Sequence, residues 1–127
     1  MFAGIEAMTT ATLSLALDAA SLRQQAIASN IANADVIDYQ PQEVRFETQL
    51  SQARESLRRN GSVDAFSLTD VQLTMTPMAN NSLQKSRSPL DVEVAKLAQN
   101  TLHYQALIKG LNKHFAILSS AISEGKK

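Results

Sequence analysis

The sequence predicts a mainly α-helical fold: two long helices, one near each end of the chain, pair as an antiparallel, coiled-coil-like hairpin around an irregular middle segment. Three observations predict it. All three prolines of the 127-residue chain lie between residues 41 and 89, so both flanks lack the residue that most strongly interrupts helices. Apolar residues recur every three or four positions in each flank. The middle segment has short, mixed patterns and turn-forming residues.

The first helix is expected over residues 9–34, with a seam whose members are spaced by four and three residues, as in helices that pack along their length. Gln24 is a polar member of this seam and is expected to fix the register of the pairing. Over residues 7–34 only Asp18 and Arg23 are charged, so we expect contacts on more than one face. A central helix of an ordinary bundle shows the same pattern. The seam consists of Leu13, Leu17, Ala20, Gln24, Ile27, Ile31 and Ala34.

The second helix begins with a clear start signal, with Ser88 as the N-cap and Pro89 at the first helical position. Running to Ser123, it would be roughly 50 Å long at about 1.5 Å per residue. Gly110 lies inside it and costs about 1 kcal/mol relative to Ala, which close approach of another helix would offset. Its seam consists of Val94, Leu97, Thr101, Tyr104, Ile108, Leu111, Phe115, Leu118 and Ile122.

The middle segment gives weaker signals. Apolar spacing predicts a short helix over residues 47–59, and alternation over residues 71–76 predicts a short strand ended by Pro77. Residues 80–88 are polar, and we expect either a surface excursion or a segment that becomes ordered on assembly. The predicted organisation is an N-terminal helical arm (1–34), a variable middle segment (35–88) and a C-terminal helical arm (89–127), with the two arms forming one helical domain.

Composition excludes several classes of protein. Twelve basic and 12 acidic residues give zero formal net charge, so no field attracts nucleic acid or an anionic membrane. Cysteine is absent, which removes disulfides, thiolate metal sites and cysteine nucleophiles. The first ten residues lack the features of a cleaved signal, and uncharged stretches near the N-terminus are too short to span a bilayer. We therefore expect a soluble cytoplasmic product, or one exported through an uncleaved signal.

Candidate chemistry is sparse. His103 and His114 would lie roughly 16 Å apart along one helix, too far to share a metal ion. The basic cluster at residues 54–59 is interrupted by an acidic neighbour and lacks aromatic residues, so it does not indicate nucleic-acid binding. Asp91 and Glu93 in the first turn of a helix are explained by compensation of its dipole. We expect no enzymatic activity, no cofactor, no metal and no small-molecule substrate.

The most specific signal is the run of residues 28–35, Ala-Ser-Asn-Ile-Ala-Asn-Ala-Asp, with a tyrosine four residues later. It resembles the signature of flagellar axial proteins, the rod and hook family, whose N-terminal helix ends in Ser-Asn-Ile-Ala-Asn-Ala before a turn and a Tyr. Asparagine side chains there are expected to cap the helix end, and the aspartate to start an Asx turn. The signature-turn residues are Ser29, Asn30, Asn33, Asp35 and Tyr39.

Other segments resemble the short subunit of the proximal rod within this family. They are Leu-Arg-Gln-Gln at residues 22–25, Val-Arg-Phe-Glu at 44–47, Leu-Asp-Val-Glu-Val at 90–94 and Asn-Thr-Leu-His-Tyr-Gln at 100–105. The family usually has Thr-Pro-Gly before the signature Tyr, whereas this chain has Val-Ile-Asp. Because aspartate tolerates a left-handed backbone better than most residues, Asp38 is expected to replace the glycine.

The resemblance implies a structural subunit of the proximal rod, the torque-transmitting shaft that crosses the periplasm in a bacterial flagellar basal body. It implies export by the flagellar type III apparatus without a cleaved signal. It also implies self-assembly in which the terminal helices pair in an inner layer, the centre contacts lateral neighbours and the hairpin is repeated helically. The implied partners are other rod subunits, the basal-body ring and its junction protein, and the export apparatus. A soluble helical adaptor or export chaperone acting through a coiled-coil groove is the alternative that the residues leave open.

Overall fold

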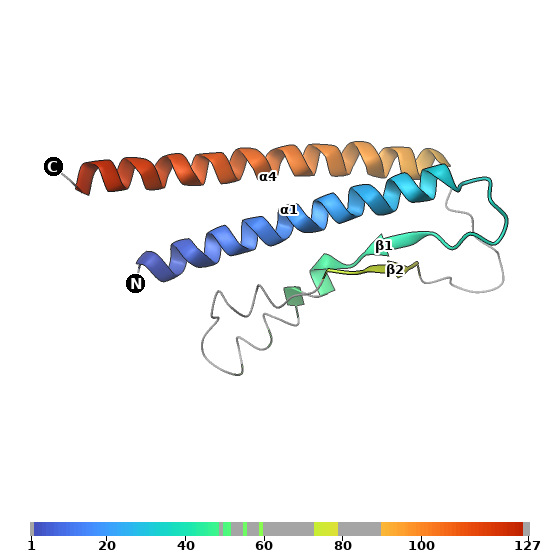
Figure 1. The fold of residues 1–127 in the computed structure, drawn as a ribbon, viewed down its shortest axis with the longest axis horizontal. Coiled ribbons are helices and arrows are strands. Elements are labelled where there is room, and N and C mark those ends of the chain that lie inside the picture. Colours follow the sequence, from blue (N-terminus) through green and yellow to red (C-terminus); the bar gives the residue numbers. More distant parts are fainter. Residues whose placement is uncertain are drawn as a thin grey trace.

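Two long helices dominate the computed structural model: α1 (Phe2–Ala32) and α4 (Leu90–Gly125) lie antiparallel, with both chain ends at one end of the hairpin (Figure 1). A ribbon of two strands, β1 (Gln42–Val44) and β2 (Met75–Pro77), lies along another side of α1, which is therefore the middle layer. The predicted mainly α fold, with paired terminal helices and a small irregular middle, is confirmed. The structure describes residues 2–48, 50, 51, 55, 59, 73–78 and 90–125.

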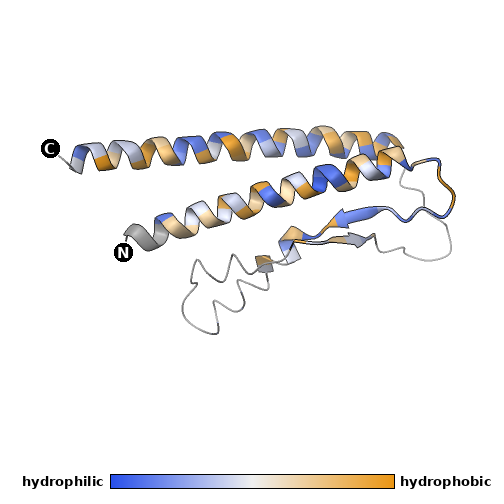
Figure 2. Ribbon diagram, viewed as in Figure 1, coloured by the Kyte–Doolittle hydropathy of each residue, from blue (hydrophilic) through white to orange (hydrophobic). Residues whose placement is uncertain are grey.

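The helix α1 is contacted on two sides, as its low charge predicts. The helix α4 packs against one side and the β ribbon against another. Leu15, Ala19, Ala26 and Ile27 are buried between these neighbours, and apolar residues occur along both helices (Figure 2). Small alanines let the neighbouring backbones approach closely, and the described core is thin and lies in the part of the hairpin nearer the turn, with no buried residue after Asn100 on α4. Among the described residues, no helix has both the length and the apolar character needed to cross a membrane.

The helix α4 turns only part of its predicted seam toward α1, together with residues outside that seam. Its buried and half-buried residues include Glu93 and Asn100, which hydrogen-bond to α1, and Leu97 is half-buried beside them. Polar groups hold these inner positions because their hydrogen bonds to α1 are made there, which a purely apolar pattern does not reveal. The apolar seam members Val94, Ile108, Phe115 and Ile122 are instead 50%, 37%, 48% and 62% exposed.

The strands β1 and β2 pair antiparallel, with Gln42 opposite Pro77 and Val44 opposite Met75. The backbone N–H of Met78 donates to the carbonyl of Pro41 at 2.9 Å. Because hydrogen-bonded and non-bonded pairs alternate in antiparallel ladders, the Gln42–Pro77 pair is a non-bonded one. The missing N–H of Pro77 therefore costs no ladder bond. The strand ends at Pro77, as predicted, but it includes the proline and is shorter than the predicted one, since Leu73 and Thr74 lie outside it.

Several predictions concern positions only partly described. A short helix was predicted over residues 47–59. Residues 46–48, 50, 51, 55 and 59 are helical, and the remaining residues of the predicted helix lie outside the described residues. The N-cap Ser88, Pro89 and the polar segment 80–88 also lie outside them. No atom of the described residues lies within 4 Å of the position where a Cβ of Gly110 would stand, so these residues do not make the close approach expected there.

Candidate functional site

The signature turn leaves α1 through backbone hydrogen bonds. The N–H of Asn33 and its side-chain amide both donate to the carbonyl of Ser29, at 3.0 and 2.8 Å. The N–H of Val36 then donates to the carbonyl of Asn33 at 3.0 Å. Asp38 has a φ of 67°, which confirms that it adopts the left-handed conformation in place of a glycine. The expected Asx turn at Asp35 is not formed, because these backbone bonds close the turn and the exposed Asp35 side chain bonds to no described residue.

The turn brings Asn30 against the first residue of β1. Asn30 is 3% exposed, and its side-chain amide meets the backbone of Gln42 at two points. The Gln42 N–H donates to Asn30 Oδ1 at 2.8 Å, and Asn30 Nδ2 donates to the Gln42 carbonyl at 2.9 Å. Since Gln42 occupies a non-bonded pair with β2, its N–H and carbonyl point to the other edge of β1. The Asn30 amide thus takes the place of a neighbouring strand.

Tyr39 connects the turn to the same amide. Its hydroxyl donates to Asn30 Oδ1 at 3.2 Å and lies 3.0 Å from the hydroxyl of Ser29. Because the Tyr39 proton is used on Asn30, Ser29 is the donor to Tyr39. The sequence-predicted residues Ser29, Asn30 and Tyr39 therefore form one hydrogen-bonded chain.

The same amide also contacts a buried carboxylate of α4. Glu93 is 1% exposed, accepts from Asn30 Nδ2 at 3.3 Å and pairs with Lys96 Nζ at 3.2 Å. A buried carboxylate requires such donors to offset its desolvation. The interpretation of Glu93 as a helix-dipole residue is therefore incomplete: it holds the start of α4 against the turn. We call the set Ser29, Asn30, Tyr39, Gln42 and Glu93 the clip.

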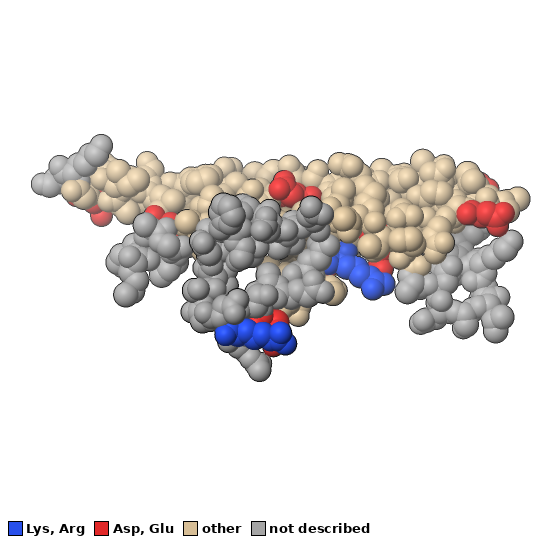
Figure 3. Space-filling model, turned by 60° about the horizontal axis from the view of Figure 1, so that its bottom comes forward, with Lys and Arg blue, Asp and Glu red and all other residues tan. Residues whose placement is uncertain are grey.

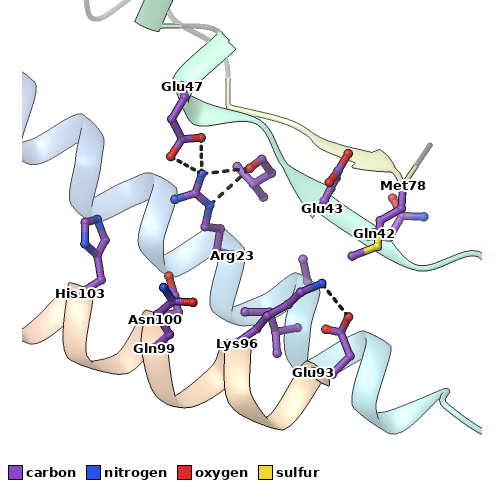
Figure 4. A pocket seen from close by; sticks show the side chains of 13 residues that line it. Arg23, Gln42, Glu43, Glu47, Met78, Glu93, Lys96, Gln99, Asn100 and His103 are labelled. Atoms are coloured by element: carbon purple, nitrogen blue, oxygen red, sulfur yellow. Dashed lines mark hydrogen bonds and ion pairs between the residues drawn. The ribbon is translucent and has the colours of Figure 1, made fainter. Parts of the chain in front are cut away.

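A second clamp lies seven residues earlier on α1. Arg23 Nε and Nη2 donate to the Val44 carbonyl at 3.3 and 3.2 Å, and Nη2 contacts both carboxylate oxygens of Glu47 at 2.8 and 2.6 Å (Figure 4). The hydrogen bond from Arg23 holds the pKa of Glu47 below its ordinary value. Arg23 and Asn30 lie two turns apart on one face of α1. Their partners on β1, Val44 and Gln42, lie two residues apart on one edge of the strand. Two α1 side chains therefore hold both ends of the strand.

A third polar contact joins the two helices at mid-length. Asn100, 7% exposed, donates from Nδ2 to the Ala20 carbonyl at 2.8 Å and to Gln24 Oε1 at 2.7 Å. Gln24 Nε2 in turn donates to the Thr101 hydroxyl at 3.4 Å. Because buried polar groups are costly when unpaired, this contact favours one register of α4 on α1.

A groove of about 370 Å³ lies between α4 and β1, above α1 (Figure 4). Its charged side chains are largely paired with one another, Arg23 with Glu47 and Glu93 with Lys96. Within the described part of the chain, no three metal-ligating side chains come together. The groove lining presents no hydroxyl or thiol nucleophile beside a base. Described charged side chains are few along the hairpin on the face shown in Figure 3.

The α1 half of the predicted seam lies at least partly inside the hairpin, and the α4 half is divided. Leu13, Leu17 and Ile31 are half-buried and Ile27 is buried, whereas Tyr104 is 39% exposed. The sequence assigned no role to Arg23, Gln42 and Asn100, and it gave Glu93 only a helix-dipole role. Two signals could have pointed to these residues. Arg23 is one of only two charged residues over positions 7–34, and Glu93 and Asn100 lie in segments that resemble the rod family. The half-buried α4 members are Leu97, Leu111 and Leu118.

The clip that closes the helical hairpin is built on Ser29, Asn30 and Tyr39, which belong to the run that resembles the signature of flagellar axial proteins, and this indicates a structural protein of that class. The model of the family described as "Flagella basal body rod protein" matches residues 11–40, which include most of α1 and the turn. The flagellar basal body rod protein FlgB of Bacillus subtilis (strain 168) is 32% identical over 93% of this chain and 95% of its own length.

Other relatives agree with this match. The FlgB proteins of Yersinia ruckeri and Escherichia coli (strain K12) are each 28% identical over 87% of this chain, and over 90% and 89% of their own lengths. The chain belongs to the FlgB family of flagellar basal body rod proteins. It is a structural protein of the flagellar basal body rod, and the alternative of an adaptor or chaperone is not supported.

Proposed function

We propose that this chain is a subunit of the proximal rod that assembles helically, with further copies and with other rod subunits, into the shaft that transmits torque. The observation that carries the proposal is the exposed apolar row on α4. Val94, Ile108, Phe115 and Ile122 stand at intervals of 7 or 14 residues along a helix whose polar groups already hold the hairpin closed. In an isolated chain these apolar side chains would be exposed to water, and a contiguous exposed apolar surface of this kind is typical of a contact with another protein.

The physical organisation also suits a load-bearing subunit. The hairpin is long and straight, and buried polar contacts at Asn30 and Asn100 hold its helices in register in the part nearer the turn. An interface that does not close on itself builds an open shaft from such units. In this role the chain has no enzymatic activity, cofactor or metal, and the groove beside β1 is part of its internal bonding.

The family membership supports more distant parts of the proposal. We include among its partners the basal-body ring with its junction protein, and the type III export apparatus that delivers the chain without a cleaved signal. The assembled rod then spans the periplasm. These partners follow from the rod role, and each is testable by co-purification with basal bodies.

The experiment is complementation of a strain that lacks this chain. Wild-type chain is expected to restore swimming and to co-purify with basal bodies, and Phe115→Asp to lose both, because a charge in the exposed row opposes burial by a neighbour. Ser120→Asp is the matched control, since Ser120 is an exposed polar position on the same helix. Normal swimming with Phe115→Asp, or equal loss with Ser120→Asp, would contradict the proposal.

A further inference from the structure

Polar side chains of α4 meet polar side chains of α1 at three levels of the hairpin. On α4 these levels are separated by seven and then by fourteen residues, so the side chains lie along one face of the helix. Each level holds a printed contact between a side chain of one helix and a side chain of the other. The contacts are Asn30–Glu93 at 3.3 Å, Gln24–Asn100 at 2.7 Å and Thr10–His114 at 3.4 Å.

A pair of leucines fills the gap between the second and third levels. Leu107 lies midway between Asn100 and His114 on α4, and Leu17 has the matching position on α1. Because the helices run antiparallel, the contacts on either side bring Leu17 level with Leu107, and both side chains are half-buried. From the turn to the chain ends the levels are therefore polar, polar, apolar and polar. We call the α4 members of these levels the register row: Glu93, Asn100, Leu107 and His114.

A neighbouring row on α4 cannot define the alignment of the two helices. Its members recur every seven residues and are all apolar or aromatic, so sliding α4 by seven residues moves each side chain into the place of a similar one. Alignments that differ by one heptad thus keep the apolar contacts of this row. Its members are Leu97, Tyr104, Leu111 and Leu118.

The register row does distinguish these alignments. A slide of α4 by seven residues toward the chain ends sets Leu107 against Thr10 and Asn100 against Leu17. A slide toward the turn also sets two polar side chains against leucines. Each mismatch removes the hydrogen-bond partner of a polar group between the helices, which destabilises that alignment. The mismatched pairs of the second slide are Leu17 with His114 and Gln24 with Leu107.

We propose that the register row is a code that selects one alignment of α4 on α1 from among those that differ by a heptad. A polar side chain in a helix seam specifies register at a cost in stability, which explains why inner positions of α4 are polar. A slide of one heptad displaces α4 by roughly 10 Å along α1. The code therefore gives every copy the same length, which suits a repeating shaft. That last consequence rests on the proposed function, whereas the alignment is a property of the single chain.

Exchanging two members of the register row tests the code. Asn100→Leu combined with Leu107→Asn keeps the composition of the chain but creates two mismatched levels in the observed alignment. After a slide of seven residues toward the chain ends, every level that remains between the helices is matched. The exchanged chain is therefore expected to adopt this second alignment. Its levels are the new asparagine with Thr10, the new leucine with Leu17, and Glu93 with Gln24 in place of Asn30.

The distance between two spin labels measures the alignment in the purified full-length chain. Because the natural chain contains no cysteine, Ser14→Cys with Ser120→Cys places one label at an exposed position of each helix. In the observed alignment Ser14 is level with Gly110, so the labelled positions are roughly 15 Å apart along the axis. The second alignment raises this separation to roughly 26 Å. We expect the shorter distance with the natural register row and the longer one with the exchanged row.

A matched control exchanges the same residue types away from α1. Leu102→Asn with Asn112→Leu alters two exposed positions of α4 and is expected to keep the shorter distance. A folded exchanged chain that shows only the shorter distance would overturn the code, and so would a shift in this control. Both results come from the free chain, so they are separate from the swimming and basal-body assays of the proposed function.

A single substitution decides the matter if the exchanged chain loses its helical circular dichroism. Asn100→Leu alone leaves one mismatched level in the observed alignment and one in the alignment slid toward the chain ends. Both label distances are therefore expected in this variant. The shorter distance alone would show that Asn100 does not select the alignment and would overturn the proposal.

Discussion

The side-chain amide of Asn30 binds the backbone of Gln42 at both its N–H and its carbonyl, at 2.8 and 2.9 Å. A single residue of α1 thereby acts as the neighbour that β1 lacks on that edge. Because the same amide also contacts Tyr39 and Glu93, the clip couples the turn, the strand and the start of α4. The Ser-Asn signature is thus explained by packing within the chain.

Removing this amide should be costly. Asn30→Ala leaves the Gln42 backbone groups and the buried Glu93 carboxylate with fewer partners, so we expect the free energy of unfolding to fall by about 2–3 kcal/mol. Denaturant unfolding followed by circular dichroism measures it. Gln25→Ala, an exposed position on the same helix, is the control and should change stability by less than about 0.5 kcal/mol. Equal stability of Asn30→Ala and wild type would refute the clip.

The Arg23–Glu47 contact predicts a small pH dependence. Its hydrogen bond lowers the folded-state pKa of Glu47 below the unfolded value, so the contact stabilises the fold above the unfolded pKa and loses that effect as pH falls through the folded pKa. Glu47 is largely exposed, so we expect less than about 1 kcal/mol. Unfolding of wild type and Glu47→Gln should differ at pH 7 and converge at acid pH. A constant difference at all pH values would contradict this assignment.

The left-handed backbone at Asp38 predicts opposite effects of two small substitutions. Asp38→Gly and Asp38→Ala both remove the side chain and its interactions, so their difference isolates the backbone conformation. With φ at 67°, we expect the glycine variant to be the more stable by about 1 kcal/mol. Thermal unfolding of the two variants measures the difference, and a more stable alanine variant would show that the turn relaxes.

The fold was largely predictable from the sequence because periodicity and proline placement act over dozens of residues. The paired helices follow from these two signals, whereas the left-handed Asp38 was expected from the resemblance to a family in which a glycine usually stands there. The residues that α4 turns toward α1 could not be fully predicted from the sequence. Apolar periodicity places Ile108 and Phe115 on the inner side, whereas Glu93 and Asn100 lie there because they form hydrogen bonds to α1.

The candidate site was half predictable for a similar reason. Ser29, Asn30 and Tyr39 stand together in a recognisable run, whereas Arg23 acts on a carbonyl 21 residues away. Such long-range bonds depend on the three-dimensional arrangement. Pro77 shows the same limit, because whether a proline can be part of a strand depends on which ladder pair it occupies.

Gly110 predicts a gain in stability. It lies mid-helix, with open space around the position of a Cβ, so Gly110→Ala introduces no clash and removes the entropic cost of glycine. We expect the free energy of unfolding to rise by about 1 kcal/mol. Denaturant midpoints measure the change. A destabilised Gly110→Ala chain would mean that the helix does not continue through this position in solution.

The inner faces of the hairpin predict loss of both fold and motility. Ile31→Asp and Leu111→Asp each place a carboxylate at a half-buried position, which costs several kcal/mol without a partner (about 2–5 kcal/mol in proteins). We expect loss of helical circular dichroism in the purified variants and loss of swimming in complemented cells. Phe115→Asp is the informative comparison, because Phe115 is 48% exposed and a carboxylate there stays in contact with water in the free chain. That variant should keep the helical signal of the free chain while losing motility, which separates contacts that fold the subunit from contacts that join it to others. Normal swimming of both Ile31→Asp and Leu111→Asp would show that the hairpin is not required in the rod.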